Sequence, residues 1–379
     1  MKIGIMTFWW SNDNYGQLLQ CYALQKYLRE KGHDVFIIRY KPTWKIRTKD
    51  KILYVLRHPV KTFCKITRKL TKKDISPETK FAIKKRNFDE FRTEYIKFSD
   101  RIYTSYKELI EYPPHADMYI AGSDQIWNYK TTYNKSDIDA YFLNFAEKGT
   151  LKYSFAASFG RNTLSDEVKK TMLPLLKGFD YVTVRENSGI SICKEMGIDA
   201  NIVCDPTLLL EKNQYLQLCN KVKTLEKKYV FLYMLSNTCI FSVHKLKEWC
   251  TENNLELVYV TGNTGWKKSN FDDEGIVKSY LSIPEWITYL SNAEYVITNS
   301  FHCSVFSLIF ERRIAFVSLS GELKSTNDRI SSLFENLKIE KNEIISNDFE
   351  KLKSLKVQKI NSELIEESKR ILDSFGENK

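Results

Sequence analysis

The residue best suited to proton transfer is His302, in the stretch TNSFHCSVFSLIF. A β-branched run before it predicts a strand, and the apolar residues 305–310 predict a buried helix. If that helix begins near Phe301, Asn299 or Ser300 caps it and His302 lies in its first turn. A helix N-terminus disfavours an imidazolium, so we expect a neutral His302 that can accept a proton. The same helix start could hold a phosphate, and a purely structural histidine is the alternative.

Arg185 is the clearest candidate for an anion contact. It follows an apolar strand in the stretch VTVREN, where an unpaired guanidinium is costly to bury. Its planar group suits a carboxylate or a phosphate, so its partner is either the neighbouring Glu186 or an anionic ligand. Lys324 and Arg329 lie in a polar stretch after the last predicted strand and are further candidates for an anion.

The stretch IAGSDQIWN follows another predicted strand. Ser123, Asp124 and Gln125 place hydrogen-bond donors and acceptors side by side there, which suits recognition of the hydroxyls of a sugar. A polar turn with an Asx cap is the alternative. Trp127 could stack on a sugar face or simply anchor the loop.

The stretch WSNDNYGQ opens the first predicted helix. Asn14 could cap that helix, with Gln17 reaching back three residues later as in a capping box. Gly16 lets the backbone come close to a ligand, and the free amides of a helix start attract anions. An ordinary capped helix is the alternative.

These stretches need a scaffold that brings them together. Short apolar runs alternate with longer amphipathic runs, as in α/β proteins. Predicted strands cover residues 2–8, 35–40, 118–121, 152–156, 181–184 and 202–204, then 229–235, 255–260, 295–297 and 314–317; predicted helices cover 17–31, 242–253, 284–291 and 361–375. Two such series predict two Rossmann-like domains, 1–205 and 206–379, the second ending in a helix. Their strand ends would face each other across a cleft.

The composition narrows the class of protein. The 379 residues are 43% hydrophobic, enough for a folded core, and no apolar stretch reaches the ~18 residues of a membrane span. The N-terminus lacks the pattern of a signal peptide. Eight cysteines occur without C-x-x-C pairs or zinc spacing, so we expect free thiols, no metal site and a cytoplasmic location.

The net charge of +11 is concentrated in one segment. Residues 41–86 hold 16 Lys or Arg against 3 Asp or Glu, a balance of +13, and the rest of the chain carries about −2. Apolar residues are interleaved with these charges, within a helical insert that we expect at about 41–100. The pattern suits peripheral contact with the inner face of the cytoplasmic membrane, or an anionic pyrophosphate-linked lipid. A helical excursion that packs on its own domain is the alternative, and nucleic acid is not expected.

Six motifs in this order carry a resemblance: NDNYGQLLQCYALQKYL, GSDQIWN, SFAASFG, VREN, DPTLLL and TNSFHCSVFSLIF. From about Met1 to about Leu337 the chain resembles the polysaccharide pyruvyl transferases. The resemblance implies transfer of the enolpyruvyl carbons of phosphoenolpyruvate onto a sugar, as a ketal that bridges two hydroxyls, with release of phosphate. It implies a fold similar to the GT-B glycosyltransferases, with bacterial members acting on lipid-linked sugars for capsule, exopolysaccharide or cell-wall polymers.

The resemblance also suggests roles. His302 is the candidate general acid or base, and Asp124 is a second candidate. The residues expected to bind the donor are Arg185, Arg329, Lys324, Ser300 and Asn299. Those expected to bind the acceptor are Asn14, Tyr15, Gly16, Ser123 and Gln125. Phosphoenolpyruvate is then a donor substrate, no cofactor is needed, and the acceptor sugar is expected on undecaprenyl pyrophosphate.

One departure keeps other functions open. Better-known members of the family carry R-L-H where this chain has Ser300, Phe301 and His302, so the arginine expected to hold the donor is a serine. Arg185, Lys324 or Arg329 takes over the anion, or donor binding differs. A glycosyltransferase that uses a nucleotide sugar would share the architecture. A non-catalytic module that binds a lipid-linked glycan is the third possibility, and the missing arginine favours it.

Overall fold

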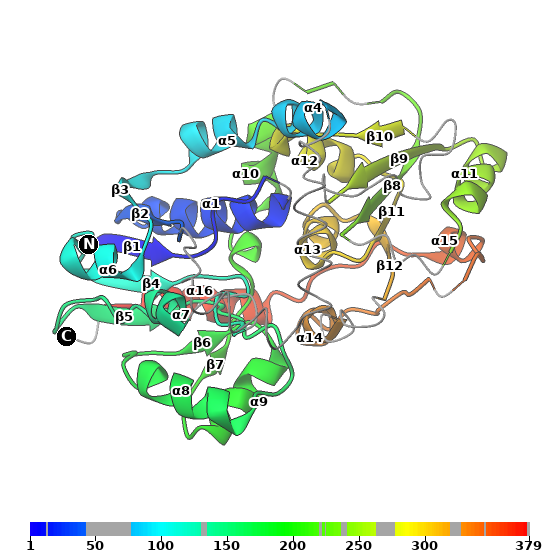
Figure 1. Cartoon of the computed structure of the whole chain (residues 1–379). Helices are drawn as coiled ribbons and strands as arrows, with labels where there is room; N and C mark the ends of the chain where they lie inside the picture. Colours follow the sequence, from blue (N-terminus) through cyan, green and yellow to red (C-terminus); the bar gives the residue numbers. More distant parts are fainter. Residues whose placement is uncertain are drawn as a thin grey trace, which may run out of the picture.

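The computed structural model describes residues 1–12, 14–42, 77–129, 135–219, 222–223, 225–235, 241–262, 277–318, 327–344 and 346–376. Lys324 and residues 43–76 of the basic segment lie outside these ranges, so the predicted membrane contact of that segment stays a prediction. Within the described ranges, no helix is long and apolar enough to cross a membrane. Figure 1 shows two parallel sheets side by side, each covered by helices.

The first sheet has five parallel strands in the order β3-β2-β1-β4-β5. Successive residues of its central strands point to opposite faces and are buried on both, as parallel sheets require. The strands are β1 (Lys2–Met6), β2 (Asp34–Tyr40), β3 (Phe98–Tyr103), β4 (Met118–Ala121) and β5 (Leu151–Ser154).

A short parallel pair extends the first sheet beyond β5. It consists of β6 (Thr183–Val184) and β7 (Asn201–Ile202), and isolated bridges from Tyr153 to Tyr181 and from Ala157 to Val184 join it to the sheet. Arg185 and Asp205 therefore follow strands of this extension.

The second sheet repeats the topology of the first. Its five parallel strands have the order β10-β9-β8-β11-β12, which is the same 3-2-1-4-5 arrangement. The strands are β8 (Tyr229–Met234), β9 (Glu256–Thr261), β10 (Val277–Ser279), β11 (Tyr295–Thr298) and β12 (Arg313–Phe316). The expected pair of Rossmann-like folds is thus confirmed.

Helices cover both faces of each sheet. Those of the first part are α1 (Tyr15–Glu30), α4 (Pro77–Arg86), α5 (Phe88–Tyr95), α6 (Tyr106–Glu111), α7 (Lys135–Tyr141), α8 (Asp166–Leu176) and α9 (Asn187–Glu195). The later ones are η1 (Pro206–Leu208), α10 (Lys212–Leu216), η2 (Gln217–Cys219), α11 (Val243–Glu252), α12 (Ile283–Ser291), α13 (Phe301–Ile309), α14 (Asn327–Asn336), α15 (Lys351–Ser354) and α16 (Glu363–Asp373).

One hydrophobic core joins the two sheets. It contains β1 and α1 from the first sheet together with β8, α12 and α13 from the second. At its centre Tyr15 stacks on Trp286 with ring centroids 5.2 Å apart, and the Tyr15 hydroxyl donates a hydrogen bond to the Leu281 carbonyl. Because this contact is apolar and buried, it favours a fixed arrangement of the two sheets over loosely linked ones.

Most predicted elements are present, and the ends of those strands and helices lie within two residues of their predicted positions. The edge strands β3 and β10 have no counterpart among the predicted strands, and the end of the expected helical insert, residues 98–100, forms the start of β3. The β3 sequence FSDRIY places two charged residues inside the strand, where they face solvent at the edge of the sheet. The predicted boundary near Asp205 and Pro206 stays a prediction.

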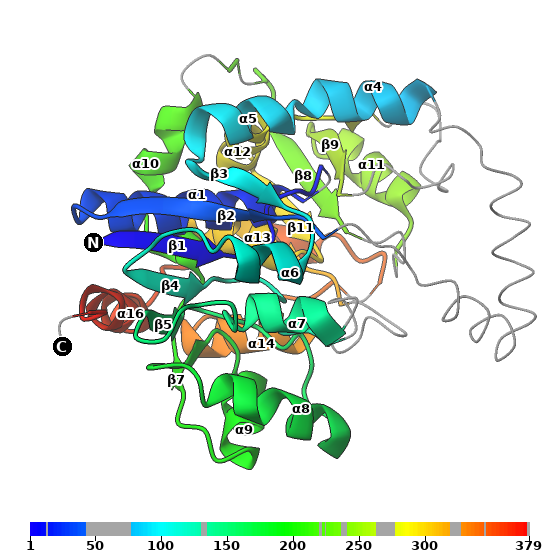
Figure 2. The same cartoon turned by 60° about the vertical axis from the view of Figure 1, so that its left-hand side comes forward.

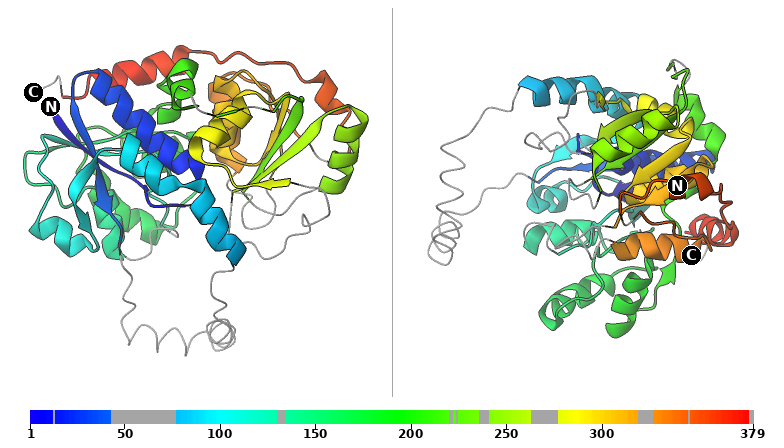
Figure 3. Two further views of the ribbon diagram at one scale, coloured as in Figure 1. Left: turned by 90° about the horizontal axis from the view of Figure 1, so that it is seen from above. Right: turned by 90° about the vertical axis from the view of Figure 1, so that its right-hand side faces the viewer.

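The terminal helix α16 is the main difference from the expected domain assignment. We predicted it as the end of the second domain, but it packs beside the first sheet (Figures 2 and 3). Phe375 stacks on Tyr153 at 4.3 Å, and the Ser368 hydroxyl accepts a hydrogen bond from the Cys204 amide. Leu372 and Phe375 are buried there, so the apolar side of an otherwise charged helix explains the position.

Candidate functional site

The site forms where the order of strands reverses in each sheet. In the first sheet the reversal lies between β1 and β4, and in the second between β8 and β11. Parallel α/β sheets bind ligands at these points, outside the carboxyl ends of the strands. The helices that follow β1 and β11, α1 and α13, begin against each other.

Gly16 and His302 make that contact. Both lie in the first turn of their helix, and a Cβ atom on Gly16 would lie only 2.1 Å from Cγ of His302. Any other residue at position 16 would therefore collide with the imidazole. We expected the glycine to let a ligand approach the backbone, but the structure uses it for the approach of His302.

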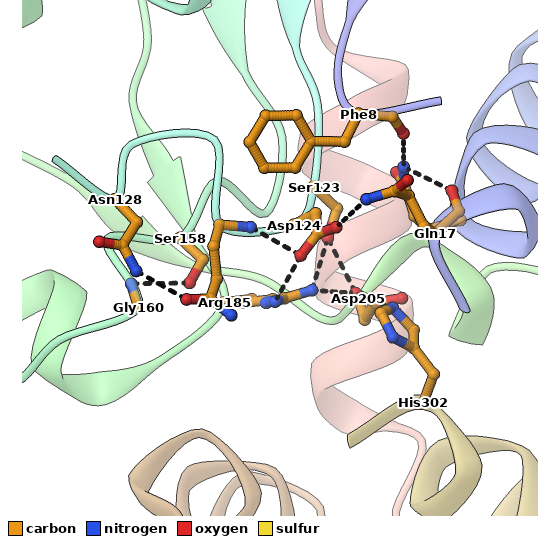
Figure 4. A network of polar contacts seen from close by, with 12 residues as sticks. Phe8, Gln17, Ser123, Asp124, Asn128, Ser158, Gly160, Arg185, Asp205 and His302 are labelled. Atoms are coloured by element: carbon orange, nitrogen blue, oxygen red, sulfur yellow. Dashed lines mark hydrogen bonds and ion pairs between the residues drawn. The ribbon is translucent and has the colours of Figure 1, made fainter. Parts of the chain in front are cut away.

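A buried polar network lies next to this contact (Figure 4). Nη1 of Arg185 is 2.8 Å from Oδ2 of Asp205 and donates a hydrogen bond to Oγ of Ser123 at 3.0 Å. Ser123 in turn donates to the same Asp205 oxygen at 2.8 Å. Nε2 of His302 lies 3.7 Å from that oxygen, so Asp205 links the guanidinium of Arg185 to the imidazole.

Three carboxylates surround Arg185. Besides Asp205, Glu186 is 3.6 Å from its Nε and Asp124 is 3.8 Å from its Nη2. Burial by itself lowers the pKa of Arg185, but these carboxylates raise it above its ordinary value. The side chain is fully buried, so in this state Arg185 is neutralised within the protein rather than open to a ligand. The sequence left Glu186 or a ligand as its partner, and the closest partner is instead Asp205.

Arg329, on α14, is the opposite case. Its guanidinium is buried, and no carboxylate of the described part of the chain lies within ion-pair distance. Burial and the nearby charge of Arg185 lower the pKa of Arg329 to about 10. With the Gln125 amide oriented so that its oxygen faces Arg329, that oxygen accepts hydrogen bonds from Nη1 at 3.0 Å and Nη2 at 3.2 Å. Among the residues that the structure describes, Nε of Arg329 has no hydrogen-bond partner, so this cation suits an anionic ligand.

Asp205 is held from both sides. Oδ1 accepts hydrogen bonds from the Thr207 amide at 3.1 Å and the Thr207 hydroxyl at 2.7 Å, which begins the turn η1. Burial alone raises the pKa of Asp205, but His302, Arg185 and the Thr207 bond outweigh it and lower the pKa well below its usual range. Asp205 is therefore ionised throughout the neutral range.

The loop after β4 brings Asp124 into the network. Asp124 has a φ of 78°, in the left-handed region that a residue with a side chain adopts rarely and that is common at functional sites. Its Oδ2 accepts a hydrogen bond from Nε2 of Gln17 at 3.2 Å, and its Oδ1 accepts one from the Gln125 amide. Trp127 is fully buried and stacks on Phe142, so it anchors the loop.

The start of α1 differs in part from its prediction. Asn14 caps the helix as expected, by accepting a hydrogen bond from the Gln17 amide at 3.2 Å. The predicted capping box is wrong, because Oε1 of Gln17 accepts from the Ser11 amide instead, which frees Nε2 of Gln17 for Asp124. Tyr15 is fully buried in the shared core, with its hydroxyl on Leu281, and so does not face a ligand.

Ser300 and Asn299, which we predicted to contact the donor, form hydrogen bonds within the protein. Ser300 caps α13 by accepting a hydrogen bond from the Cys303 amide at 3.4 Å. Asn299 accepts a hydrogen bond from the Leu235 amide at 2.7 Å, which fixes the loop after β8. Both lie beside His302 and hold the start of its helix.

The structure therefore gathers His302, Arg185, Arg329, Ser123, Asp124, Gln125 and Gly16 at one place. Sequence reasoning missed Asp205 and Ser158 as members. The Ser158 hydroxyl donates to Oε1 of Glu186 at 2.6 Å. For Asp205 a signal existed, since the motif DPT follows a predicted strand just as VREN does.

The comparison of sequences places the chain in a family. Residues 14–321 match the family described as Polysaccharide pyruvyl transferase, so the protein belongs to that family, as its motifs suggested. This membership supports a transferase that acts in polysaccharide biosynthesis. A search of curated proteins found no significant match.

Solved structures support the fold. The UDP-GlcNAc 2-epimerase of Methanocaldococcus jannaschii, in complex with UDP-GlcNAc and UDP, superposes with a TM-score of 0.54 at 13% identity, over 99% of this chain and 100% of that one. An S. aureus MnaA–UDP structure gives 0.51 at 10% identity, over 99% and 95% of the two chains. The UDP-N-acetylglucosamine 2-epimerase of Rickettsia bellii gives 0.50 at 9%, over 100% and 96%. At this identity the likeness concerns the fold alone, which is of the GT-B type.

Proposed function

We propose that this protein transfers the enolpyruvyl group of phosphoenolpyruvate to two hydroxyls of a sugar, forms a pyruvate ketal and releases phosphate. The acceptor in this proposal is a hexose or N-acetylhexosamine of a bacterial surface polysaccharide, carried on undecaprenyl pyrophosphate. The observation that carries the proposal is the buried Arg329, a cation without a carboxylate partner in the described ranges, beside a network that ends in His302.

Arg329 is the main donor contact in this proposal. Phosphoenolpyruvate carries a carboxylate and a phosphate, and either would supply the negative charge that Arg329 lacks. The sequence favoured Arg185 for this role, but the three carboxylates around Arg185 already balance its charge. Arg329 thereby takes the place of the arginine that family members carry at the position of Ser300. No cofactor or metal takes part, and Lys324 stays a second candidate for the donor.

His302 is the group that moves protons. Ketal formation adds a proton to the methylene carbon of the donor and forms two bonds from sugar oxygens to its central carbon. The bond from that carbon to the phosphate oxygen breaks. The two sugar hydroxyls lose two protons in total, of which one ends on the new methyl group and one on phosphate. A group that can accept and return a proton at this point contributes about 10²–10⁴-fold.

The acceptor sugar is placed against the loop after β4. Asp124 and Gln125 are the proposed polar contacts there, and Asp124 is the second candidate acid or base. Ser123, also expected from the sequence to contact the acceptor, is fully buried with its hydroxyl bonded to Arg185 and Asp205. In this proposal Asn14 and the helix start around Gly16 would bind acceptor hydroxyls or pyrophosphate.

Mass spectrometry of candidate lipid-pyrophosphate sugars incubated with the protein and phosphoenolpyruvate tests the proposal. We expect one acceptor to gain the mass of pyruvate less one water, together with release of phosphate. His302→Ala should remove phosphate release without changing the circular dichroism spectrum. Near-normal turnover of that variant would show that His302 is not the proton carrier.

Thermal unfolding separates the alternatives. The proposal expects phosphoenolpyruvate to raise the melting temperature, because it binds the folded state. A rise with UDP and none with phosphoenolpyruvate would favour a nucleotide-sugar glycosyltransferase. Binding of a lipid-linked glycan without phosphate release from any donor would favour a non-catalytic module.

A further inference from the structure

His302 is clamped between two elements that come from opposite sides of the site. On one side lies Gly16 of α1, whose added Cβ would lie 2.2 Å from Nδ1 of the ring. On the other side Nε2 points to Oδ2 of Asp205 at 3.7 Å. Nε2 is buried and has no hydrogen-bond partner within the described ranges, so the Asp205 carboxylate faces it as a nearby negative charge. The ring therefore has a defined orientation, with its two nitrogens in different surroundings.

The carboxylate that faces Nε2 is built to stay in place. Thr207 holds Oδ1 through two hydrogen bonds, and Ser123 and Arg185 hold Oδ2. Asp205 follows the extension of the first sheet, whereas His302 begins α13 after β11 of the second. The pair thus spans the junction of the two sheets.

We propose that Asp205 is a positioning residue for His302, holding a proton on Nε2 so that Nδ1 is the nitrogen that accepts a proton during the reaction. This inference rests on the proposed function of His302. When Nδ1 takes the proton of a sugar hydroxyl, the imidazolium that forms lies against the negative carboxylate and is stabilised by it. Neither the family match nor the comparison structures assign this role to Asp205.

One charged group faces the ring directly, and several others lie around that group. Asp205 faces it directly from the loop after β7. Arg185 pairs with Asp205 and has Asp124 and Glu186 beside it. Arg329 on α14 lies near Arg185 and these carboxylates, and the Tyr215 hydroxyl on α10 lies near Asp205. The first turns of α1 and α13 hold no acidic residue. Asp205 is therefore the negative group whose removal should change the imidazole most.

A purely structural role for Asp205 makes a different prediction. In that case the residue only balances Arg185 and begins η1, and its loss would lower stability without changing the protonation of His302. Asp205→Asn separates the two roles, because the amide keeps the size and one acceptor oxygen but removes the charge.

The test is a pH titration of the ¹⁵N-histidine-labelled protein by NMR, from about pH 5 to about pH 9. The five histidines are few enough for His302 to be assigned by comparison with His302→Ala. We expect the neutral ring to carry its proton on Nε2. In Asp205→Asn the midpoint of the His302 titration should move down by about one pH unit, since a neighbouring negative charge favours the imidazolium.

Thr207→Val is the matched control. It removes the hydroxyl that holds Oδ1 but leaves the Asp205 charge, so the midpoint should stay within about 0.3 units. A folded Asp205→Asn protein with an unchanged midpoint would overturn the inference. If that variant does not fold, the wild-type spectrum decides, because a neutral ring protonated on Nδ1 contradicts the inference by itself.

Kinetics adds a second readout. Asp205→Asn should lower kcat on the order of 10²-fold, with the acid limb of the pH–rate profile moved to lower pH and the donor KM within about threefold. A fall in kcat with an unmoved acid limb would indicate the structural role. The NMR titration needs no turnover, so it can support the pair even if the protein proves not to transfer pyruvate.

Discussion

The two sheets share one strand order, but they bring opposite charges to the site. The first sheet and its extension contribute Asp124, Glu186 and Asp205, with Arg185 enclosed among them. The second-sheet side contributes His302 at the start of α13 and Arg329 on α14. One topology has thus been used for two tasks, since its loops carry the chemistry while its strands set only positions.

Two buried arginines of the site make the contrast concrete. Arg185 has more carboxylates around it than one charge needs, and its pKa is raised; Arg329 has none within ion-pair distance among the described residues, and its pKa falls to about 10. A balanced buried charge supports structure, whereas an unbalanced one is ready for a ligand. We therefore expect the carboxylates around Arg185 to keep their positions, and Arg329 to change its contacts when an anionic ligand binds.

Replacing each arginine with methionine should give the largest difference. Arg185→Met leaves three buried carboxylates without a counterion and should lower the free energy of unfolding by about 3–5 kcal/mol. Arg329→Met removes a desolvated charge and should change it by less than about 1 kcal/mol, while raising the donor KM. Urea unfolding measures the change in the free energy of unfolding for both variants. Equal losses would contradict the different roles of the two arginines.

Gly16→Ala tests the contact that joins the two sides. Helix propensity alone predicts a gain of about 1 kcal/mol, but a methyl group 2.1 Å from Cγ of His302 should instead cost about 1–3 kcal/mol and disturb turnover. In the double variant Gly16→Ala, His302→Ala the collision is gone, so most of the stability should return. Thermal unfolding of the wild type, the two single variants and the double variant completes this double-mutant cycle. If the two single losses of stability add up in the double variant, the contact between Gly16 and His302 is contradicted.

Low pH should lower the free energy of unfolding, because Asp205 becomes protonated and loses its ionic contacts. Its pKa is depressed in the folded state, so its contribution is complete above the unfolded value of about 3.9 and is lost as the pH falls toward the folded pKa. The free energy of unfolding of the wild type should therefore decline below about pH 4 more steeply than that of Asp205→Asn. Urea titrations at several acidic pH values measure the two slopes; identical slopes would mean that Asp205 is not preferentially ionised in the folded state.

The smallest expected effect concerns Trp127. Trp127→Phe removes the hydrogen bond from Nε1 to the Tyr141 carbonyl and should cost about 1 kcal/mol, with little change in the acceptor KM. A large rise in that KM with unchanged stability would show that the indole contacts the sugar after all.

Much of the scaffold was readable from sequence. The interior strands β1, β4, β8 and β11 are apolar because helices cover both faces, so composition alone marks them. The edge strands β3 and β10 were missed because an edge tolerates charge and short length. His302 and Arg185 were found because each follows a strand at the ligand-binding edge. Arg329 was expected in a polar stretch after the last strand and lies instead on the helix α14.

The sequence by itself determined the class of fold, the cap of α1 and the positions of His302 and Arg185 after strands, since these depend on local periodicity and spacing. Only the tertiary structure decided that Asp205 would neutralise Arg185, that Gly16 would receive His302, and that α16 would return to the first sheet. Those outcomes depend on groups far apart in the chain that meet in a low-dielectric interior, where an unpaired charge is costly and side chains are closely packed.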